Sequence, residues 1–322
     1  AGFLLIRIGA IDVIYEWHFE RDQDILLRTF LREQGVSRKL LARVRHHGGK
    51  VCINGEASHM RTHLKQGDFI SLHVPDEGEH ETTVPSAIPI SILFEDEHFL
   101  VVDKPYGVAS IPSRQQPDMS MANRVKGYYQ SQNYPDQVIH IITRLDRDTT
   151  GVMLFAKNKY THALMDQQLR KKTIEKIYYA ILTDTARFSA DHGFIDAPIG
   201  RTEDSIITRM VREDGKAALT EYWREETFSE GELVRIKLHT GRTHQIRVHF
   251  EHMGAPLLGD NLYGGRADDL MPRQALHCRE VSFIHPFTEE EMTIVSPLPA
   301  DFYNWIASQR GKGGVMDART TI

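Results

Sequence analysis

Residues 143–151 read Thr-Arg-Leu-Asp-Arg-Asp-Thr-Thr-Gly, a polar and charged stretch that stands between two apolar runs. Residues 138–142 precede it and residues 152–156 follow it, and runs rich in Val and Ile are typical of buried strands. The stretch therefore carries two arginines and two aspartates out of a predicted sheet core. An acid held beside arginines at a strand end can stay ionised and act as a nucleophile. A solvated surface turn is the alternative, and spacing alone favours it because short motifs give many false positives.

Two further segments complete a resemblance to a known family. Residues 144–151, followed by an apolar run ending in Ala-Lys-Asn, resemble the active-site signature of the RluA-type pseudouridine synthases. Residues 176–180, Lys-Ile-Tyr-Tyr-Ala, resemble the Lys-x-Tyr-x-Ala strand of that family. Residues 240–249, Thr-Gly-Arg-Thr-His-Gln-Ile-Arg-Val-His, and the glycines, proline, Asp260 and Tyr263 that follow resemble its third motif. The match covers roughly residues 90 to 300, and three motifs in order are far more specific than one.

The resemblance implies an enzyme that isomerises uridine to pseudouridine in RNA. Such an enzyme breaks the N1–C1′ bond of the nucleoside, turns the base and rejoins it through C5. The family needs one aspartate and no cofactor, and the matching residue here is Asp146. Asp146 would either attack C1′ or assist departure of the uracil to leave a glycal, and the sequence leaves both routes open.

The resemblance also implies partners for Asp146. A carboxylate shielded from water needs a basic partner to stay ionised, and the family places that arginine at Arg247. Arg242 is the competitor, with contact to an RNA phosphate as its other role. Tyr178 would stack on the target uracil and use its hydroxyl in proton transfer. By its pattern alone, a tyrosine in an apolar strand is more often a core residue, and we expect Tyr179 to be the packing residue.

Arg144 is the residue that the resemblance assigns to base flipping. A uridine inside folded RNA reaches a pocket only after leaving its stack, and the arginine would brace the vacated space. The alternative is a surface arginine paired with Asp148, which is a weak interaction when exposed. The sequence departs from the commoner family pattern at Thr143, where a histidine often stands, and at Thr150, where a serine often stands. Any histidine contact with RNA is thereby in doubt.

Length and composition agree with a soluble two-domain protein. The chain has 322 residues, which suggests about two domains. Its apolar runs are shorter than the ~20 residues of a membrane helix, and its apolar N-terminus lacks the charged region of a signal peptide. The two cysteines, Cys52 and Cys278, imply no disulfide framework and favour a reducing cytoplasm.

Charge is segregated along the chain, although the formal net charge is −5. Residues 36–50 contain five basic residues and no acid, and residues 235–249 contain four and again no acid. Acidic residues cluster in 76–81, 95–97 and 289–291. A chain of this kind can bind a polyanion through its basic faces while staying soluble.

The N-terminal region resembles an S4-type RNA-binding domain. Residues 22–34 have helical apolar spacing, Ser37 can cap a second helix, and Asn54-Gly55 indicates a tight turn between strands. The resemblance makes the basic face of the second helix an RNA contact, with a solvated helix face as the alternative. The Lys-Pro-x-Gly turn at residues 104–107 resembles another family signature. The predicted RNA-binding residues outside the catalytic set are Arg144, Arg242, Arg38, Lys39, Arg43, Arg45 and Lys104.

The element pattern predicts an α+β fold. Strands outnumber helices and no βαβ alternation occurs, so we expect a mixed, mainly antiparallel sheet. We predict an S4-like domain at 12–75, a linker at 76–89, a catalytic domain at 90–306 and a disordered tail at 307–322. Predicted strands of the catalytic domain are 90–94, 99–102, 138–142, 152–156, 177–183, 233–239 and 281–284, and predicted helices are 120–130, 160–171 and 244–253.

Other functional classes lack their motifs. Seventeen histidines raise the question of a metal site, but the zinc-hydrolase helix pattern is absent and the cysteines lack ligand spacing. No nucleophile elbow, P-loop or dinucleotide fingerprint occurs. We therefore predict a pseudouridine synthase without metal or cofactor that acts on 23S ribosomal RNA, with tRNA as the alternative target. A non-catalytic, S4-type ribosome-associated RNA-binding protein is the alternative function. We expect a monomer with no membrane association.

Overall fold

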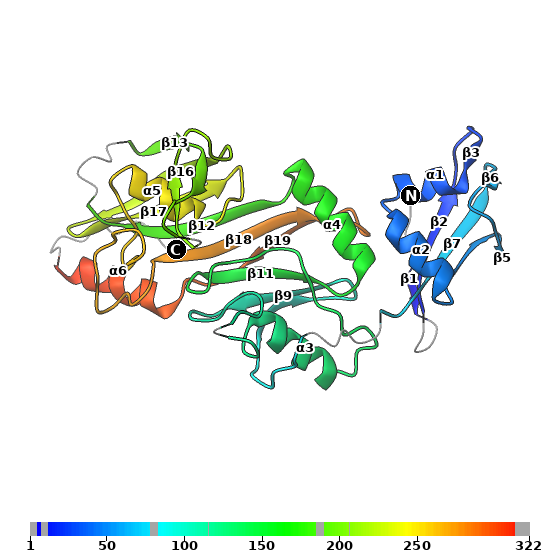
Figure 1. Ribbon diagram of the computed structural model, residues 1–322, viewed down its shortest axis with the longest axis horizontal. Helices are drawn as coiled ribbons and strands as arrows, with labels where there is room; N and C mark the ends of the chain where they lie inside the picture. Colours follow the sequence, from blue (N-terminus) through cyan, green and yellow to red (C-terminus); the bar gives the residue numbers. More distant parts are fainter. Residues whose placement is uncertain are drawn as a thin grey trace.

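The computed structural model describes residues 5–7, 12–77, 83–114, 116–184, 190–205 and 207–312. Two parts follow one another along the chain, a smaller N-terminal module (residues 12–75) and a larger part built on a ten-stranded sheet (Figure 1). The module stands beside helix α4, at one end of the large sheet.

The module contains a five-stranded sheet in the order β1-β2-β7-β4-β5 and two short helices. The second helix and the strands around Asn54-Gly55 are confirmed, and Ser37 caps this helix by accepting a hydrogen bond from the Leu40 amide. The first helix, predicted over residues 22–34, is shorter, because Ile25 and Leu26 form strand β3 and the helix begins at Leu27. Strand β2 was not predicted, although its residues Tyr15, Trp17 and Phe19 alternate in the manner of a half-buried strand. The elements are β1 (Leu5–Arg7), β2 (Asp12–Phe19), β3 (Ile25–Leu26), α1 (Leu27–Glu33), α2 (Arg38–His46), β4 (Lys50–Ile53), β5 (Glu56–Ala57), β6 (His63–Leu64) and β7 (Asp68–Pro75).

Aromatic residues fasten the module to the larger part. The Tyr15 ring lies edge-on to Tyr160, with 4.5 Å between centroids, and stacks on Phe287 at 5.7 Å. The Tyr15 hydroxyl donates to Asn158 Oδ1 at 3.1 Å, and the Tyr160 hydroxyl donates to the Gln34 carbonyl at 2.6 Å. The buried hydroxyls therefore have partners across the boundary, and the two parts share one apolar cluster.

The large sheet has the strand order β13-β16-β17-β12-β18-β11-β9-β8, with β10 paired to β11 and β19 paired to β18. Its single parallel pair among the described strands joins β11 to β18, and the other pairs are antiparallel. The predicted α+β class with a mixed, mainly antiparallel sheet is confirmed. The elements are β8 (Ser91–Glu95), β9 (Phe99–Lys104), α3 (Met121–Ser131), β10 (His140–Ile141), β11 (Thr150–Ala156), α4 (Lys159–Lys171), β12 (Glu175–Leu182), β13 (His192–Asp196), β14 (Ile199–Arg201), β15 (Arg209–Val211), β16 (Leu219–Phe228), β17 (Gly231–Leu238), α5 (Gln245–His252), β18 (Leu276–Ile284), β19 (Glu291–Val295) and α6 (Ala300–Lys312).

Helices cover both faces of the large sheet. Met165 of α4 and Phe250 of α5 pack in one apolar cluster with the inward side chains of β11, β12 and β17. Val125 of α3 packs on the opposite face against β9 and β11, and Trp305 of α6 packs against Ile181. Because β11 is buried along its whole length, its sequence is a continuous apolar run without alternation.

Three predicted segments differ in the structure. The predicted strand 138–142 is reduced to the two residues of β10. Residues 76–89 were predicted to be a linker, but the described residues of this segment bind the larger part. Glu77 accepts from the Lys159 amide at 2.8 Å, and Asn123 donates to the Val84 carbonyl at 2.7 Å. A disordered tail from 307 is wrong for residues 307–312, because α6 continues to Lys312 with Gln309 buried. Residues 313–322 lie outside the described residues.

Gly151 is required where β11 begins. Its φ is +113°, and a Cβ at this position would stand 2.1 Å from the Cys278 carbonyl oxygen on β18. We expect Gly151→Ala to lower the free energy of unfolding by about 2–4 kcal/mol, from backbone strain and steric overlap together. Urea unfolding measures the change. Gly311→Ala is the control, because its Cβ would meet open space; equal stability of both variants would contradict the prediction.

Candidate active site

The loop between β10 and β11 is held by buried hydrogen bonds on both sides of Asp146. The Ser110 hydroxyl accepts from the Leu145 amide at 3.0 Å and donates to the Leu145 carbonyl at 2.6 Å. Lys104 donates to the Arg147 carbonyl at 2.8 Å, and Arg273 donates to the Asp148 carbonyl at 3.1 Å. Leu145 packs into the main core. The backbone on either side of Asp146 is therefore fixed, while its own side chain points into a pocket.

Lys104 has a structural role, which corrects its prediction as an RNA contact. The residue is fully buried, and its ammonium donates to the carbonyls of Pro105, Val108 and Arg147 at 2.8–3.0 Å. Its three N–H groups are thus all used inside the protein. Burial lowers the pKa of Lys104 to about 7. The Lys-Pro-x-Gly turn therefore supports the backbone of the loop that carries Asp146.

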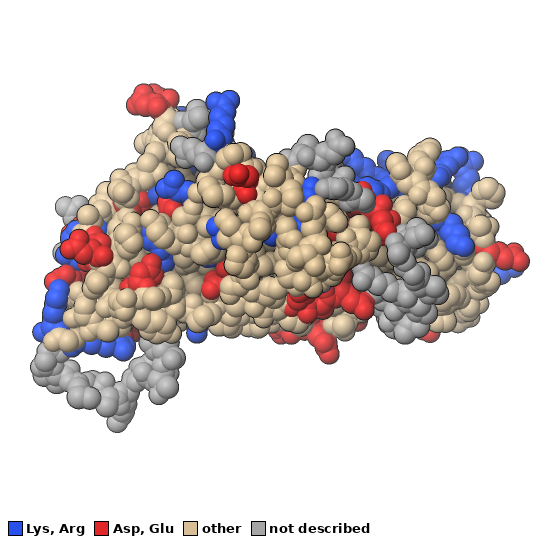
Figure 2. Space-filling model, turned by 90° about the horizontal axis from the view of Figure 1, so that it is seen from below, with Lys and Arg blue, Asp and Glu red and all other residues tan. Residues whose placement is uncertain are grey.

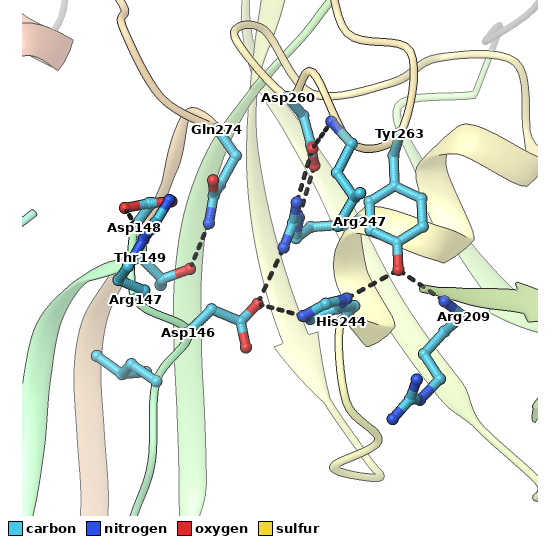
Figure 3. A network of polar contacts seen from close by, with 12 residues as sticks. Asp146, Arg147, Asp148, Thr149, Arg209, His244, Arg247, Asp260, Tyr263 and Gln274 are labelled. Atoms are coloured by element: carbon cyan, nitrogen blue, oxygen red, sulfur yellow. Dashed lines mark hydrogen bonds and ion pairs between the residues drawn. The ribbon is translucent and has the colours of Figure 1, made fainter. Parts of the chain in front are cut away.

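Arg247 lies between two carboxylates (Figure 3). Its guanidinium donates to Asp260 through Nε at 2.6 Å and through Nη2 at 2.7 Å. The remaining terminal nitrogen, Nη1, faces Asp146 Oδ2 at 3.5 Å. Asp260 is 1% exposed, whereas the Asp146 side chain keeps 29% exposure to the pocket. Arg247 is thus anchored by the bidentate pair with Asp260 and presents its free edge to Asp146.

The charge of Arg247 is secured by the same contacts. Burial by itself lowers the pKa of Arg247, but the hydrogen bonds and charge of Asp260 outweigh it, and Asp146 adds to their effect. The net result is a raised pKa, so the guanidinium stays charged. The cation also lies over the Tyr263 ring at 4.8 Å, an additional favourable contact.

His244 is a second neighbour of Asp146 that was not predicted. Its Nε2 lies 3.9 Å from Asp146 Oδ2, and its Nδ1 lies 2.8 Å from the Tyr263 hydroxyl. The Tyr263 oxygen accepts from the Arg209 amide at 2.9 Å, so its own hydrogen is free for Nδ1 (Figure 3). In the neutral tautomer whose Nδ1 accepts from Tyr263, the histidine proton is on Nε2 and faces the carboxylate. Burial lowers the pKa of His244, which favours its neutral form.

Tyr178 lies in the same pocket as Asp146, on strand β12. The residue is 6% exposed, and burial raises its pKa well above the ordinary value, with further increases from the neighbouring Cys278 and from Asp146. The phenol therefore stays protonated and can act as a hydrogen-bond donor. The pocket has a volume of ≈ 600 Å³ and is also lined by Arg144, Arg242 and Arg247, a size usual for small-molecule sites.

Two arginines stand exposed around this pocket. Arg144 forms no hydrogen bond or ion pair with the described residues, and the alternative pairing with Asp148 does not occur, since Asp148 pairs with Arg147 at 2.8 Å. Arg242 donates through Nε to the Ala217 carbonyl at 3.0 Å and is otherwise exposed. Arg247, and not Arg242, faces Asp146. Both exposed guanidinium groups are therefore available to an anionic ligand.

Helix α2 of the module presents a basic face with one exception. Arg38, Lys39 and Arg45 are exposed. Arg43 instead turns to the segment after the module, where it pairs with Glu77 at 3.6 Å and donates to the Asp76 carbonyl at 3.0 Å. Figure 2 shows Lys and Arg side chains at both ends of the molecule, with a group of acidic side chains between them. Arg43 thus connects α2 to the segment after the module. Of the four basic residues of α2 that were predicted to contact RNA, the other three are exposed.

The described residues lack two further features. No group of three or more His, Cys, Asp or Glu side chains among them is placed to hold a metal ion. Within the same residues, every helix is too short or too polar to span a bilayer.

Comparison with known proteins gives one consistent family. The model of the family described as RNA pseudouridylate synthase matches residues 98–252. A Bacillus subtilis protein described as an uncharacterized RNA pseudouridine synthase, YjbO, is 40% identical over 283 residues, covering 88% of this chain and 99% of its own. A ribosomal large subunit pseudouridine synthase D from Pseudomonas aeruginosa is 36% identical, covering 81% and 83%. Human RNA pseudouridylate synthase domain containing 4 shares the fold at 23% identity and TM-score 0.57, covering 68% of this chain and 93% of its own.

The chain belongs to the RNA pseudouridylate synthase family. It is an RNA pseudouridine synthase, an isomerase, and the predicted enzyme class is confirmed. The alternative of a non-catalytic RNA-binding protein is not favoured.

Asp260, His244 and Tyr263 complete the surroundings of Asp146, yet the sequence interpretation gave them no role. All three stand in or just after the third motif, and that position was the available signal. Their roles could not be predicted from the sequence, because they depend on tertiary contacts. Asp260 contacts Arg247, and Tyr263 contacts His244.

Proposed function

We propose that this enzyme isomerises uridine in structured large-subunit ribosomal RNA, with Asp146 as the reacting carboxylate. The observation that carries the proposal is the Asp146 carboxylate in an open pocket, faced by an arginine that a second acid holds in place. The name of the Pseudomonas aeruginosa relative supports the ribosomal target. Transfer RNA is the alternative target.

The reaction breaks the N1–C1′ bond, turns the uracil and forms a C5–C1′ bond. The proton on C5 is then lost, and N1 gains a proton, so the atoms balance. Substrate and product are isomers, so no redox partner or group donor is required, and we propose that no cofactor takes part. Asp146 either forms a bond to C1′ or stabilises the ribose as the base departs. In both routes the Arg247 guanidinium orients the carboxylate and stabilises negative charge on it.

Three other side chains receive roles in the same pocket. The Tyr178 ring would stack on the uracil, and its protonated hydroxyl could donate to the base. Arg144 would occupy the space that the flipped uridine leaves in the RNA. Arg242 would contact a backbone phosphate. The exposure of both arginines supports these assignments.

We further propose that the N-terminal module is an S4-like RNA-binding domain that acts in a monomer. Its exposed basic residues on α2 are Arg38, Lys39 and Arg45. Phosphate contacts of such residues supply affinity without sequence readout.

Mapping pseudouridines in total RNA of cells with and without this protein tests the target. One or more uridines of 23S ribosomal RNA should lose the modification in its absence, and the purified protein should restore it on a transcript of that region. Loss confined to tRNA would assign the alternative target. No change in any RNA would overturn the proposed function.

Removal of positive charge from α2 should weaken RNA binding and make that binding less dependent on salt concentration. The double variant Lys39→Ala/Arg45→Ala should reduce the slope of log K against log salt by about one unit per lost phosphate contact. Filter binding of the mapped RNA from 50 to 200 mM salt measures it. Arg310→Ala/Lys312→Ala, at the end of α6, removes the same charge elsewhere and should leave the slope unchanged. Equal slopes for both double variants would contradict a role for the module.

A further inference from the structure

Lys176 is a second lysine of the site, and the hydrogen bonding of its ammonium is the opposite of that of Lys104. It stands on β12 two residues before Tyr178, so both side chains lie on the same face of the strand, and both line the pocket of Asp146. Its ammonium forms no hydrogen bond or ion pair with any of the described residues. Lys104, in contrast, uses all of its donors on carbonyl oxygens.

The charges around Lys176 leave its ammonium uncompensated. Besides burial, the group that acts on the pKa of Lys176 is Cys278, a thiol whose own pKa burial raises to about 12, so it carries no charge at neutral pH. Asp146 is already faced by Arg247. Burial accordingly lowers the pKa of Lys176. An enclosed cation without a partner is destabilising in the free protein, and such groups in clefts are candidates for ligand contacts.

We propose that Lys176 binds the target base by donating a hydrogen bond to a carbonyl oxygen of the uracil, O4 or O2. The inference deepens the proposed function and rests on it. A base stacked on Tyr178 would bring an edge within reach of a lysine two residues away on the same strand face.

A phosphate is the less suitable partner for this position. Arg144 and Arg242 are exposed and free to bind the RNA backbone, whereas Lys176 is half-buried beside the buried Tyr178. A flat, neutral base loses less hydration than a phosphate on entering such a place. If the acceptor is O4, the contact also discriminates against cytosine, which carries an amino donor at C4. If the acceptor is O2, no such discrimination follows, because both bases share that oxygen.

The test is a cycle of protein variants and substrate analogues. Wild type and Lys176→Met act on a short RNA that contains the mapped target as uridine, 2-thiouridine or 4-thiouridine, and single-turnover rates are followed by nucleoside chromatography. Lys176→Met should lower the rate on uridine roughly 10- to 100-fold, as expected for loss of a hydrogen bond from a charged group. One thio-substitution should lower the wild-type rate and leave the rate of Lys176→Met unchanged, which identifies the acceptor oxygen.

The control variant is Lys237→Met on the neighbouring strand β17. Lys237 pairs with the exposed Glu175 at 2.7 Å and lies outside the pocket lining, so its rates should equal those of wild type. Lys176→Met should also unfold at an equal or higher temperature, because it removes an unpaired, half-buried charge. Marked destabilisation, or equal effects of both thio-substitutions in wild type and variant, would overturn the inference. Inactivity of wild type on every RNA would instead refute the proposed target.

Discussion

Asp146→Asn should reduce the rate of pseudouridine formation by about 10⁴-fold or more while leaving the protein folded. The amide keeps the size of the side chain but loses the negative charge and the nucleophilic oxygen. Little stability is lost, because Asp146 is partly exposed and Arg247 keeps its bidentate partner Asp260. The free energy of unfolding should change by less than about 1 kcal/mol. Single-turnover assays on the mapped RNA, together with urea unfolding, measure both quantities.

The neighbouring acid provides a matched control for that variant. Asp148 is two residues away in the same loop and pairs with the exposed Arg147. Asp148→Asn should keep its rate within a few-fold of wild type, since an exposed pair contributes little. RNA binding should be similar for both variants, because phosphate contacts supply most of the affinity. An Asp146→Asn protein with substantial activity would show that another group performs the chemistry.

Asp260→Asn should be the most destabilising change at the site. The substitution leaves the buried Arg247 without its principal counter-charge, and breaking a buried pair in this way costs about 3–5 kcal/mol. The guanidinium also loses the two bonds of 2.6 and 2.7 Å that orient it. Activity should therefore fall even at temperatures where the variant remains folded. Urea unfolding and single-turnover rates at low temperature separate the two effects.

A double variant distinguishes the cost of an unpaired charge from the cost of lost packing. Arg247→Met/Asp260→Leu replaces the whole pair with apolar side chains, and such replacements are often neutral or stabilising. It should recover most of the stability lost in Asp260→Asn and none of the activity, because Asp146 then lacks its cation. A double variant as unstable as the single variant would show that the packing of the two side chains, and not their charge, stabilises the fold. Recovery of activity would show that Arg247 is dispensable.

The strands that carry the site were predictable because their sequence patterns are local. Residues 152–156 and 177–183 are continuous apolar runs, and both form central strands of the sheet. The family resemblance predicted that Arg247 faces Asp146, and the structure places Arg247 Nη1 3.5 Å from Asp146 Oδ2. Asp260 could not be assigned by spacing, because its contact depends on how the segment after α5 returns over that helix.

Other differences between the prediction and the structure arise where residues of polar segments, expected to be exposed, are buried. Lys104 is the last residue of β9 and precedes a Pro-Tyr-Gly turn, a position usually exposed, yet three carbonyl oxygens enclose its ammonium. Glu77 belongs to an acidic, Pro-bearing stretch, yet it is nearly buried between His140 and Arg43. The disordered tail was predicted to begin at residue 307, but Phe302 and Trp305 anchor α6, which continues to Lys312. In each case a tertiary partner, invisible in the local sequence, decides the outcome.

The parallel pairing of β11 with β18 has a consequence for the order in which the protein folds. It joins Gly151 to Cys278, so a long stretch of chain must be in place before the two strands meet. Non-local pairings of this kind form slowly, because loop-closure entropy is lost before the contacts compensate for it. Asp146 precedes β11, and Arg247 and Asp260 lie inside the closed stretch. Catalytic competence therefore arises only when the sheet closes, and a chain with its helices formed but β18 undocked has no active site.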